Sequence, residues 1–354
     1  MTAARAKALV FVVPGPINTL TGGYIYDREM IAGLRRRGWN VDVRELAGTF
    51  PLPAPADRAA AATTLSMLPE GSLVVLDGLA LGSLPEEVAR VSNRLRLVAL
   101  VHHPLADETG LLPEVKSALF ESERRALRAV QRVVVTSAPT AAGLARYDVA
   151  PAEITVIEPG TERAPLSRGS PGAVVELLCV ASIVPRKGHD ILVHALTSLR
   201  SQRCHLTCVG GQTRDPKWAA RLKAQIRDEG LDDRITFVGD TGHSALDAYY
   251  DAADVFVLPT WYEGYGMVVA EALARGLPVV STATGAIGDL VGSDAGLLVP
   301  PGDVAALAAA LTSVVQDTAL RARLAEGARR VRDRLPTWDD ATELMEKTLE
   351  AAGG

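Results

Sequence analysis

The chain has 354 residues, which is enough for two domains of ordinary size. Its hydrophobic share of 48% and charged share of 22% are typical of a globular protein and exclude a disordered one. The formal net charge is −5, from 37 basic and 42 acidic residues, so we expect no nucleic-acid partner.

The N-terminal half alternates short apolar, β-branched runs with segments of helical spacing. This alternation predicts a parallel sheet that is covered by helices on both faces. The predicted strands are Leu9–Val13, Val41–Val43, Leu73–Leu76, Leu97–Val101, Val133–Thr136 and Ile154–Ile157.

The same pattern restarts after Glu158–Val174, a segment rich in proline and glycine that we interpret as a linker. The second set of predicted strands is Leu177–Val180, Leu206–Val209, Ile235–Val238, Val255–Leu258, Pro278–Ser281 and Leu297–Val299. We therefore predict an α/β protein with two doubly wound domains, 1–165 and 166–335. A helix in 336–354 is expected to pack back on the N-terminal domain. Ligands of such sheets bind outside the carboxyl ends of the strands, which favours an active site in the cleft between the domains.

Targeting signals and disulfides are not expected. Met1–Ala8 lacks the apolar stretch of a signal peptide, and no window of about 20 apolar residues could form a spanning helix. Cys179, Cys204 and Cys208 lie in apolar runs, which indicates buried, reduced thiols. We expect a cytoplasmic protein without a transmembrane segment, and peripheral contact with a membrane stays open.

Two glycines and two histidines follow strands of the N-terminal half. Gly22 and Gly23 open a predicted helix, where backbone N–H groups can meet a phosphate, although glycine often simply shapes such loops. His102 and His103 lie at the carboxyl end of a strand. A histidine pair can bind a metal, but no carboxylate or cysteine lies at ligand spacing in this segment, so no metal site is predicted.

A basic loop follows the first strand of the C-terminal half. Arg186 and Lys187 lie where an anion is expected to bind, although two surface cations would have the same appearance. Only six of the 37 basic residues are lysines, which gives Lys187 more weight.

The strongest local signal is the segment Thr260–Gly276, in which a strand, a glycine-flanked turn and a helix follow one another. Gly264 and Gly266 allow backbone N–H groups to approach a phosphate at the positive end of the helix. Glu263 and Glu271 near an anion site would serve hydroxyl groups, such as those of a sugar and a ribose on either side of a diphosphate. Alternatively, both are ordinary helix surface charges.

This segment resembles the E-x7-E motif of family 4 glycosyltransferases, which are retaining enzymes of the GT-B fold that use nucleotide sugars. The resemblance extends through Leu273–Asp303 and, in weaker form, over nearly the whole chain. It implies two facing Rossmann-like domains with an interdomain cleft. It also implies that Glu271 binds the donor ribose and that Glu263 is a catalytic residue that contacts the transferred sugar. The backbone at the sugar and phosphates would come from Gly264, Tyr265, Gly266 and Met267.

The resemblance assigns further roles outside this segment. Lys187 would bind the donor diphosphate as a catalytic residue, with Gly22 and Gly23 touching it from the opposite domain. His102 would be the active-site histidine near the sugar and the acceptor.

The sequence also departs from the family pattern. Ala181 and Ser182 stand where Gly-Arg is usual, so Arg186 is the candidate to replace the missing phosphate contact. Gly285 and Asp289 are assigned to the periphery of the donor site.

The implied activity is retaining, metal-independent transfer of a sugar from a nucleoside-diphosphate sugar to a small-molecule, lipid or oligosaccharide hydroxyl. UDP is favoured because it is the commonest donor nucleotide of the resembled family. The sequence has no Asp-x-Asp pair to clamp a metal-bound nucleotide sugar, so no cofactor is expected. Two alternatives stay open. One is a phosphorylase-like enzyme of the same fold, and the other is a non-catalytic sugar- or nucleotide-binding partner of a glycosyltransferase.

Overall fold

The computed structural model describes residues 7–47 and 49–353. It divides into two compact units, which we call the N-terminal unit (up to Gly160, and again from Pro336) and the C-terminal unit (161–335). The first boundary therefore lies at Gly160 rather than at 165. The reason is that the segment after Gly160 is hydrogen-bonded to the C-terminal unit: Arg332 donates to Ala164 O.

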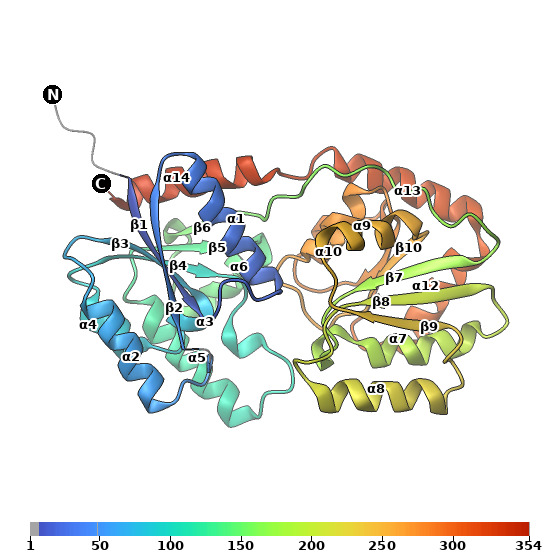
Figure 1. Cartoon of the computed structure of the whole chain (residues 1–354), viewed down its shortest axis with the longest axis horizontal. Coiled ribbons are helices and arrows are strands. Elements are labelled where there is room, and N and C mark those ends of the chain that lie inside the picture. Colours follow the sequence, from blue (N-terminus) through green and yellow to red (C-terminus); the bar gives the residue numbers. More distant parts are fainter. Residues whose placement is uncertain (1–6, 48, 354) are drawn as a thin grey trace. The chain divides into compact units, whose positions relative to one another are not determined.

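The N-terminal unit contains a six-stranded parallel sheet with the strand order β2-β1-β3-β4-β5-β6 (Figure 1). Its strands are β1 (Ala8–Pro14), β2 (Asn40–Leu46), β3 (Leu73–Asp77), β4 (Arg96–Val101), β5 (Arg132–Val135) and β6 (Ile154–Val156). Its α-helices are α1 (Gly22–Arg36), α2 (Pro55–Ser66), α3 (Gly78–Leu81), α4 (Pro85–Val91), α5 (Pro113–Leu127), α6 (Ala138–Gly143) and α14 (Trp338–Gly353).

Both faces of this sheet are buried, which explains why its strands are nearly continuous apolar runs. Phe11 and Val13 of β1 belong to the core beneath α1 and α14, while Val12 belongs to the core beneath α2 and α4. The side chains of a strand point alternately to the two faces, so each face receives its own apolar set.

Helix α14 completes the N-terminal unit by packing against α1. The helices approach so closely at Gly33 that an added Cβ would lie 2.2 Å from Thr342 Oγ1. Met345 is fully buried, and the Trp338 ring packs edge-on against Tyr26 with ring centroids 5.9 Å apart. The final helix is therefore part of the core of this unit.

The C-terminal unit contains a second six-stranded parallel sheet, with the order β12-β11-β10-β7-β8-β9. Its strands are β7 (Val175–Val180), β8 (Cys204–Val209), β9 (Ile235–Gly239), β10 (Val255–Leu258), β11 (Val279–Thr282) and β12 (Gly296–Val299). Its α-helices are α7 (His189–Leu196), α8 (Pro216–Asp228), α9 (His243–Ala252), α10 (Met267–Ala274), α11 (Ile287–Val291), α12 (Val304–Gln316) and α13 (Thr318–Arg332).

The prediction of two doubly wound parallel sheets is confirmed, and each predicted strand is present. The three cysteines are buried and carry free thiols, as the sequence predicts. Within the described residues, no helix combines the length and the apolar content that crossing a bilayer requires.

The strand order of each sheet reverses once. In the N-terminal unit the chain changes direction across the sheet between β1 and β3, and in the C-terminal unit between β7 and β10. In doubly wound proteins, ligands bind at these reversals, outside the carboxyl ends of the strands. Each unit therefore has one place where a site is expected.

Candidate functional site

The reversal in the C-terminal unit brings a lysine and a glutamate together. Lys187 lies in a short 3₁₀ helix after β7 (Pro185–Lys187), and Glu263 lies in the loop after β10. Lys187 Nζ donates a hydrogen bond to Glu263 Oε1, and the Nη1 atom of Arg186 lies 3.7 Å from the same oxygen. The sequence-predicted Arg186, Lys187 and Glu263 thus form one cluster.

Backbone contacts hold the two loops of this cluster together. Arg186 donates to Tyr262 O at 2.7 Å, and Trp261 N donates to Arg186 O at 2.8 Å. Gly188 has a φ of +66°, and an added Cβ would lie 2.0 Å from Pro259 O. Only glycine fits this conformation and this approach, so Gly188 sets the distance between the loops.

The cluster contains two cations, Arg186 and Lys187, and one anion, Glu263. Burial favours the neutral acid, but Lys187 and Arg186 outweigh it and lower the pKa of Glu263 below its usual range. Burial lowers the pKa of Lys187. The attraction between Lys187 and Glu263 opposes this shift, but repulsion from the neighbouring Arg186 partly cancels that attraction. The carboxylate faces two cations, whereas the ammonium faces one anion and one cation. The cluster therefore carries an excess of positive charge that suits a polyanion.

The glycine-flanked turn leads into α10 as predicted. Gly266 precedes the helix with a φ of +97°, and Tyr265 is buried under the turn. Gly285 supports the turn from the other side, because an added Cβ there would lie 1.7 Å from Glu263 O. Asp289 is exposed on α11.

Glu271 is held within α10 by a partner that the sequence does not reveal. Tyr250, a buried residue of α9, donates to Glu271 Oε2 at 2.9 Å. Arg275 covers the Tyr250 ring at 4.4 Å from its centroid. The hydrogen bond from Tyr250 therefore orients Glu271, the second glutamate of the predicted motif.

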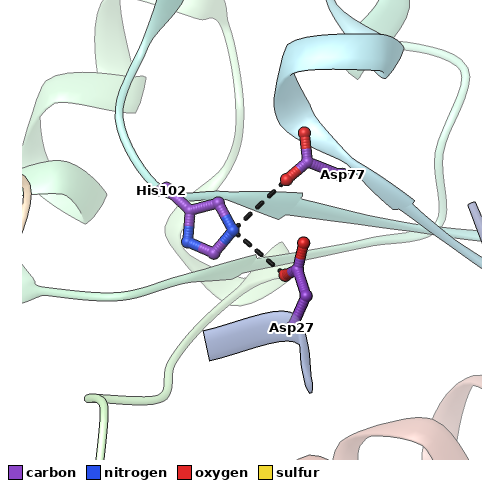
Figure 2. A group of neighbouring side chains, drawn as sticks. All are labelled: Asp27, Asp77 and His102. Carbon is purple, nitrogen blue, oxygen red and sulfur yellow. Dashed lines mark hydrogen bonds and ion pairs between the residues drawn. The ribbon is translucent and has the colours of Figure 1, made fainter. Parts of the chain in front are cut away.

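The reversal in the N-terminal unit holds a second cluster, formed by His102, Asp27 and Asp77 (Figure 2). His102 follows β4, Asp77 ends β3, and Asp27 lies on α1. His102 Nε2 lies 3.1 Å from Asp27 Oδ1 and 3.3 Å from Asp77 Oδ2. Sequence reasoning found no acidic ligand for His102 because both carboxylates come from distant segments of the chain.

Charge and packing fix the imidazole in place. Burial favours its neutral form, but Asp27 and Asp77 outweigh burial and raise the pKa of His102 to about 10. Burial raises the pKa of Asp27 to about 6, with His102 opposing that shift. An added Cβ at Gly23 would lie 3.1 Å from His102 Cδ2, so the predicted Gly23 contacts the predicted histidine. Gly22 is the first residue of α1.

Beside this cluster, a buried glutamate anchors the loop that follows His102. Glu123 of α5 is fully buried, and its Oε2 accepts a hydrogen bond from Leu105 N at 2.9 Å. Burial raises the pKa of Glu123 to about 8. The acid is therefore largely protonated in the folded protein at neutral pH.

This shifted acid predicts how stability depends on pH. The folded pKa of Glu123 exceeds its unfolded value, so its contribution is fully present near pH 4 and is lost as pH rises through 8. Glu123→Gln should flatten the fall of the unfolding free energy between pH 5 and 8, measured by urea denaturation. Glu121→Gln, on the exposed side of the same helix, should leave the slope unchanged. An unaltered slope in Glu123→Gln would contradict the assignment.

Comparison with known proteins shows which family and which relatives the chain is similar to. Residues 165–331 match the family described as glycosyl transferases group 1. A D-inositol 3-phosphate glycosyltransferase of Salinispora arenicola is 31% identical in an alignment of length 268, which covers 66% of this chain and 59% of that protein. The chain spans 38–59% of the first four curated relatives, or about half of their length.

Solved structures share the whole architecture. Sucrose-phosphate synthase from Thermosynechococcus elongatus aligns with a TM-score of 0.81 and 22% identity, covering 98% of each chain. Anabaena HepE in complex with UDP-glucose aligns with a TM-score of 0.77 and 19% identity, covering 97% of this chain and 99% of HepE. The predicted fold class, GT-B with two Rossmann-like domains, is thereby confirmed.

Proposed function

We propose that this chain, whose residues 165–331 match the family described as glycosyl transferases group 1, transfers a sugar from a nucleoside-diphosphate sugar to a hydroxyl acceptor. The observation that carries this proposal is the cluster of Arg186, Lys187 and Glu263 at the reversal of the C-terminal sheet. Two cations and one carboxylate at that position suit a diphosphate joined to a sugar.

The residues of the cluster would divide the work as follows. Lys187 has three N–H groups, and its bond to Glu263 occupies one of them, so it can also donate to a phosphate. The start of α10 would add the backbone N–H groups of the Gly264–Met267 turn. Glu263 and Glu271 would accept hydrogen bonds from hydroxyl groups of the sugar and the ribose. His102 stays a prediction as the active-site histidine.

The proposed reaction retains the anomeric configuration and needs no metal at the diphosphate. The bond between the anomeric carbon and the phosphate oxygen breaks, and the acceptor oxygen bonds to the same face of that carbon. The hydroxyl proton passes to the departing diphosphate, whose charge Lys187 and Arg186 stabilise. We favour a UDP-sugar, with support from the UDP-glucose bound to HepE.

The acceptor and the cellular location complete the proposal. We propose a small-molecule, lipid or oligosaccharide acceptor and a cytoplasmic enzyme with at most peripheral membrane contact. The absence of a spanning helix among the described residues is compatible with this location.

Three measurements test the proposal. A calorimetric panel of UDP-, GDP- and ADP-sugars should show one preferred donor, with weaker binding of inorganic phosphate. Tight binding of phosphate alone would favour a phosphorylase-like enzyme. NMR of the product should show the donor's anomeric configuration, and prior chelation should leave turnover unchanged. An inverted product or a chelator-sensitive rate would contradict the mechanism.

The tyrosine beneath Glu271 gives a further prediction. Tyr250→Phe removes one hydrogen bond to a charged group, worth about 1.5–3 kcal/mol when intact. Because Glu271 would bind the donor ribose, we expect the donor KM to rise by roughly tenfold while kcat changes little. The adjacent Tyr249→Phe serves as the control, since Tyr249 packs against the apolar core. A fall in kcat at unchanged KM would contradict a ribose-binding role.

A further inference from the structure

The five residues after His102 form a loop, 103–107, that we call the histidine loop. At its start, Thr136 Oγ1 donates a hydrogen bond to His102 O at 3.2 Å. In its middle, Leu105 N donates a hydrogen bond to Glu123 Oε2 at 2.9 Å. The middle of the histidine loop is thus attached to helix α5 through a carboxyl group.

Close packing holds Glu123 against this loop. The Glu123 side chain is fully buried. Gly82 lies so near that an added Cβ would be 2.7 Å from Leu105 Cδ1 and 3.1 Å from Glu123 Cγ. Ser122, the neighbouring residue of α5, donates a hydrogen bond to Gly82 O at 2.6 Å. These contacts fix the turn of α5 that carries Glu123 beside the histidine loop.

A buried tyrosine lies beside the same carboxyl group. The Tyr147 ring packs against Phe120, one turn before Glu123 on α5, with ring centroids 4.5 Å apart. Burial and the neighbouring Glu123 raise the pKa of Tyr147. The Tyr147 hydroxyl and Glu123 Oε1 are both buried, and among the described residues neither atom has a hydrogen-bond partner. A proton on Oε1 would make this oxygen a donor, for which the tyrosine oxygen is an acceptor.

The surrounding charges do little to stabilise an ionised Glu123. Burial raises its pKa to about 8, Asp107 adds to this shift, and Arg146 opposes it. Because Asp107 and Arg146 form an ion pair with each other, their effects largely cancel. Of the helices packed on α5, α3 has no charged residue, and the two acids of α4 pair with arginines: Glu86 with Arg125, and Glu87 with Arg58. An ionised Glu123 would therefore be a poorly compensated charge in the core, which water solvates when the histidine loop opens.

We propose that Glu123, in its protonated form, is a positioning residue that holds the histidine loop closed next to His102. The neutral carboxyl group accepts from Leu105 N with Oε2 and directs its own proton from Oε1 to Tyr147. Ionisation favours the open loop, in which water solvates the carboxylate. The effect on turnover rests on the proposed transfer reaction, in which His102 is the active-site histidine, whereas the effect on loop opening does not.

Hydrogen exchange of the full chain, measured by mass spectrometry, tests the loop without any substrate. In the open loop Glu123 ionises at its ordinary pKa, whereas in the closed loop it ionises only near pH 8. Linkage then makes opening about tenfold more frequent at pH 7 than at pH 6. We expect this increase in the exchange of peptides that cover 103–107, after division by the intrinsic exchange rate. Peptides of the C-terminal unit provide the internal reference.

Glu123→Gln should remove this pH dependence. Glutamine keeps an acceptor for Leu105 N and a donor for Tyr147, and it cannot ionise. The corrected exchange of the histidine loop should therefore be the same at pH 6 and pH 7. Glu121→Gln, on the exposed side of the same helix, is the matched control and should behave like the wild type.

Turnover separates positioning from a purely structural role. Hydrolysis of UDP-glucose, measured as release of UDP, needs no identified acceptor. In the wild type, kcat should fall about tenfold from pH 7 to pH 9, as Glu123 in the closed loop loses its proton. Glu123→Gln should keep the rate at pH 7 and lose this fall. Glu123→Leu, which cannot accept from Leu105 N, should lower kcat at least tenfold while the donor KM stays unchanged.

Two results would overturn the proposal. One is the same pH dependence of loop exchange in the wild type and in Glu123→Gln. The other is equal kcat in Glu123→Gln and Glu123→Leu at pH 7. If the wild type releases no UDP while its loop exchange follows the expected pH dependence, the proposed function fails and the proton-dependent closure of the histidine loop stands.

Discussion

Lys187→Met is expected to lower kcat/KM for sugar transfer by about 10²- to 10³-fold, the effect of removing one donor that stabilises charge in a transition state. Lys187 is the partly buried cation between β7 and α7 that bonds to Glu263 and, in the proposed reaction, to the departing diphosphate. Its attraction for the leaving group grows as the bond to the sugar breaks. The loss should therefore fall on kcat as well as on donor binding.

Stability has to be measured alongside activity. Removing the ammonium leaves Glu263 buried beside Arg186, whose Nη1 is 3.7 Å away. Loss of one partner of a buried ion pair costs about 3–5 kcal/mol, and Arg186 should offset part of this. The double variant Lys187→Met/Glu263→Gln should therefore recover stability without recovering activity.

The control for this experiment is Lys223→Met. Lys223 is exposed on α8, and its replacement should change neither turnover nor melting temperature. Suppose that Lys187→Met and Lys223→Met both keep kcat/KM for transfer within threefold of the wild-type value. Lys187 would then not act on the diphosphate. Retained donor binding in an inactive wild-type chain would instead favour the non-catalytic alternative.

Gly285→Ala is expected to destabilise the C-terminal unit by about 3 kcal/mol. Gly285 has a φ of +52°, a conformation that costs other residues about 1–2 kcal/mol. The added methyl group would also lie 1.7 Å from Glu263 O, and such overpacking costs about 1–3 kcal/mol. The backbone of Glu263 must move to relieve the contact, so transfer should fall together with stability.

Gly288→Ala gives a sharp comparison three residues further along. Gly288 lies in α11, and an added Cβ would meet nothing within 4 Å. Alanine there should leave stability unchanged or raise it by about 0.5–1 kcal/mol, because glycine is unfavourable inside helices. Chemical denaturation of both variants measures the difference. Equal stabilities of the two variants would contradict the close contact between Gly285 and Glu263 O.

The sequence predicted the strands well for a simple reason. Both sheets are parallel and covered on both faces, so their strands are short, apolar and β-branched, and few other segments have that composition. The meeting of Lys187 and Glu263 was also predictable, because both residues follow strands at the same edge of one sheet. The GT-B resemblance rested on these same segments.

Other parts of the two clusters were not predictable in the same way. Asp27 lies within a helix, where an acidic residue is normally read as exposed, yet it is fully buried. Tyr250 comes from α9 and has no motif of its own. Asp77 could have been predicted, because it lies at the carboxyl end of a buried strand, as His102 does. Applying the rule about carboxyl ends to acidic residues as well as to histidines would have identified it.

The way the chain passes between its units has a consequence for dissecting the protein. Residues 161–335 are one contiguous insertion, whereas the N-terminal unit is assembled from two pieces of chain. A fragment ending at Gly160 would lack the apolar side of α14, including Met345 and Leu349, and would expose the matching surface of α1. The insertion contains all the residues of its own large core cluster, so we expect it to fold when it is expressed by itself. The remainder calls for complementation, in which a peptide of residues 336–353 restores the missing layer.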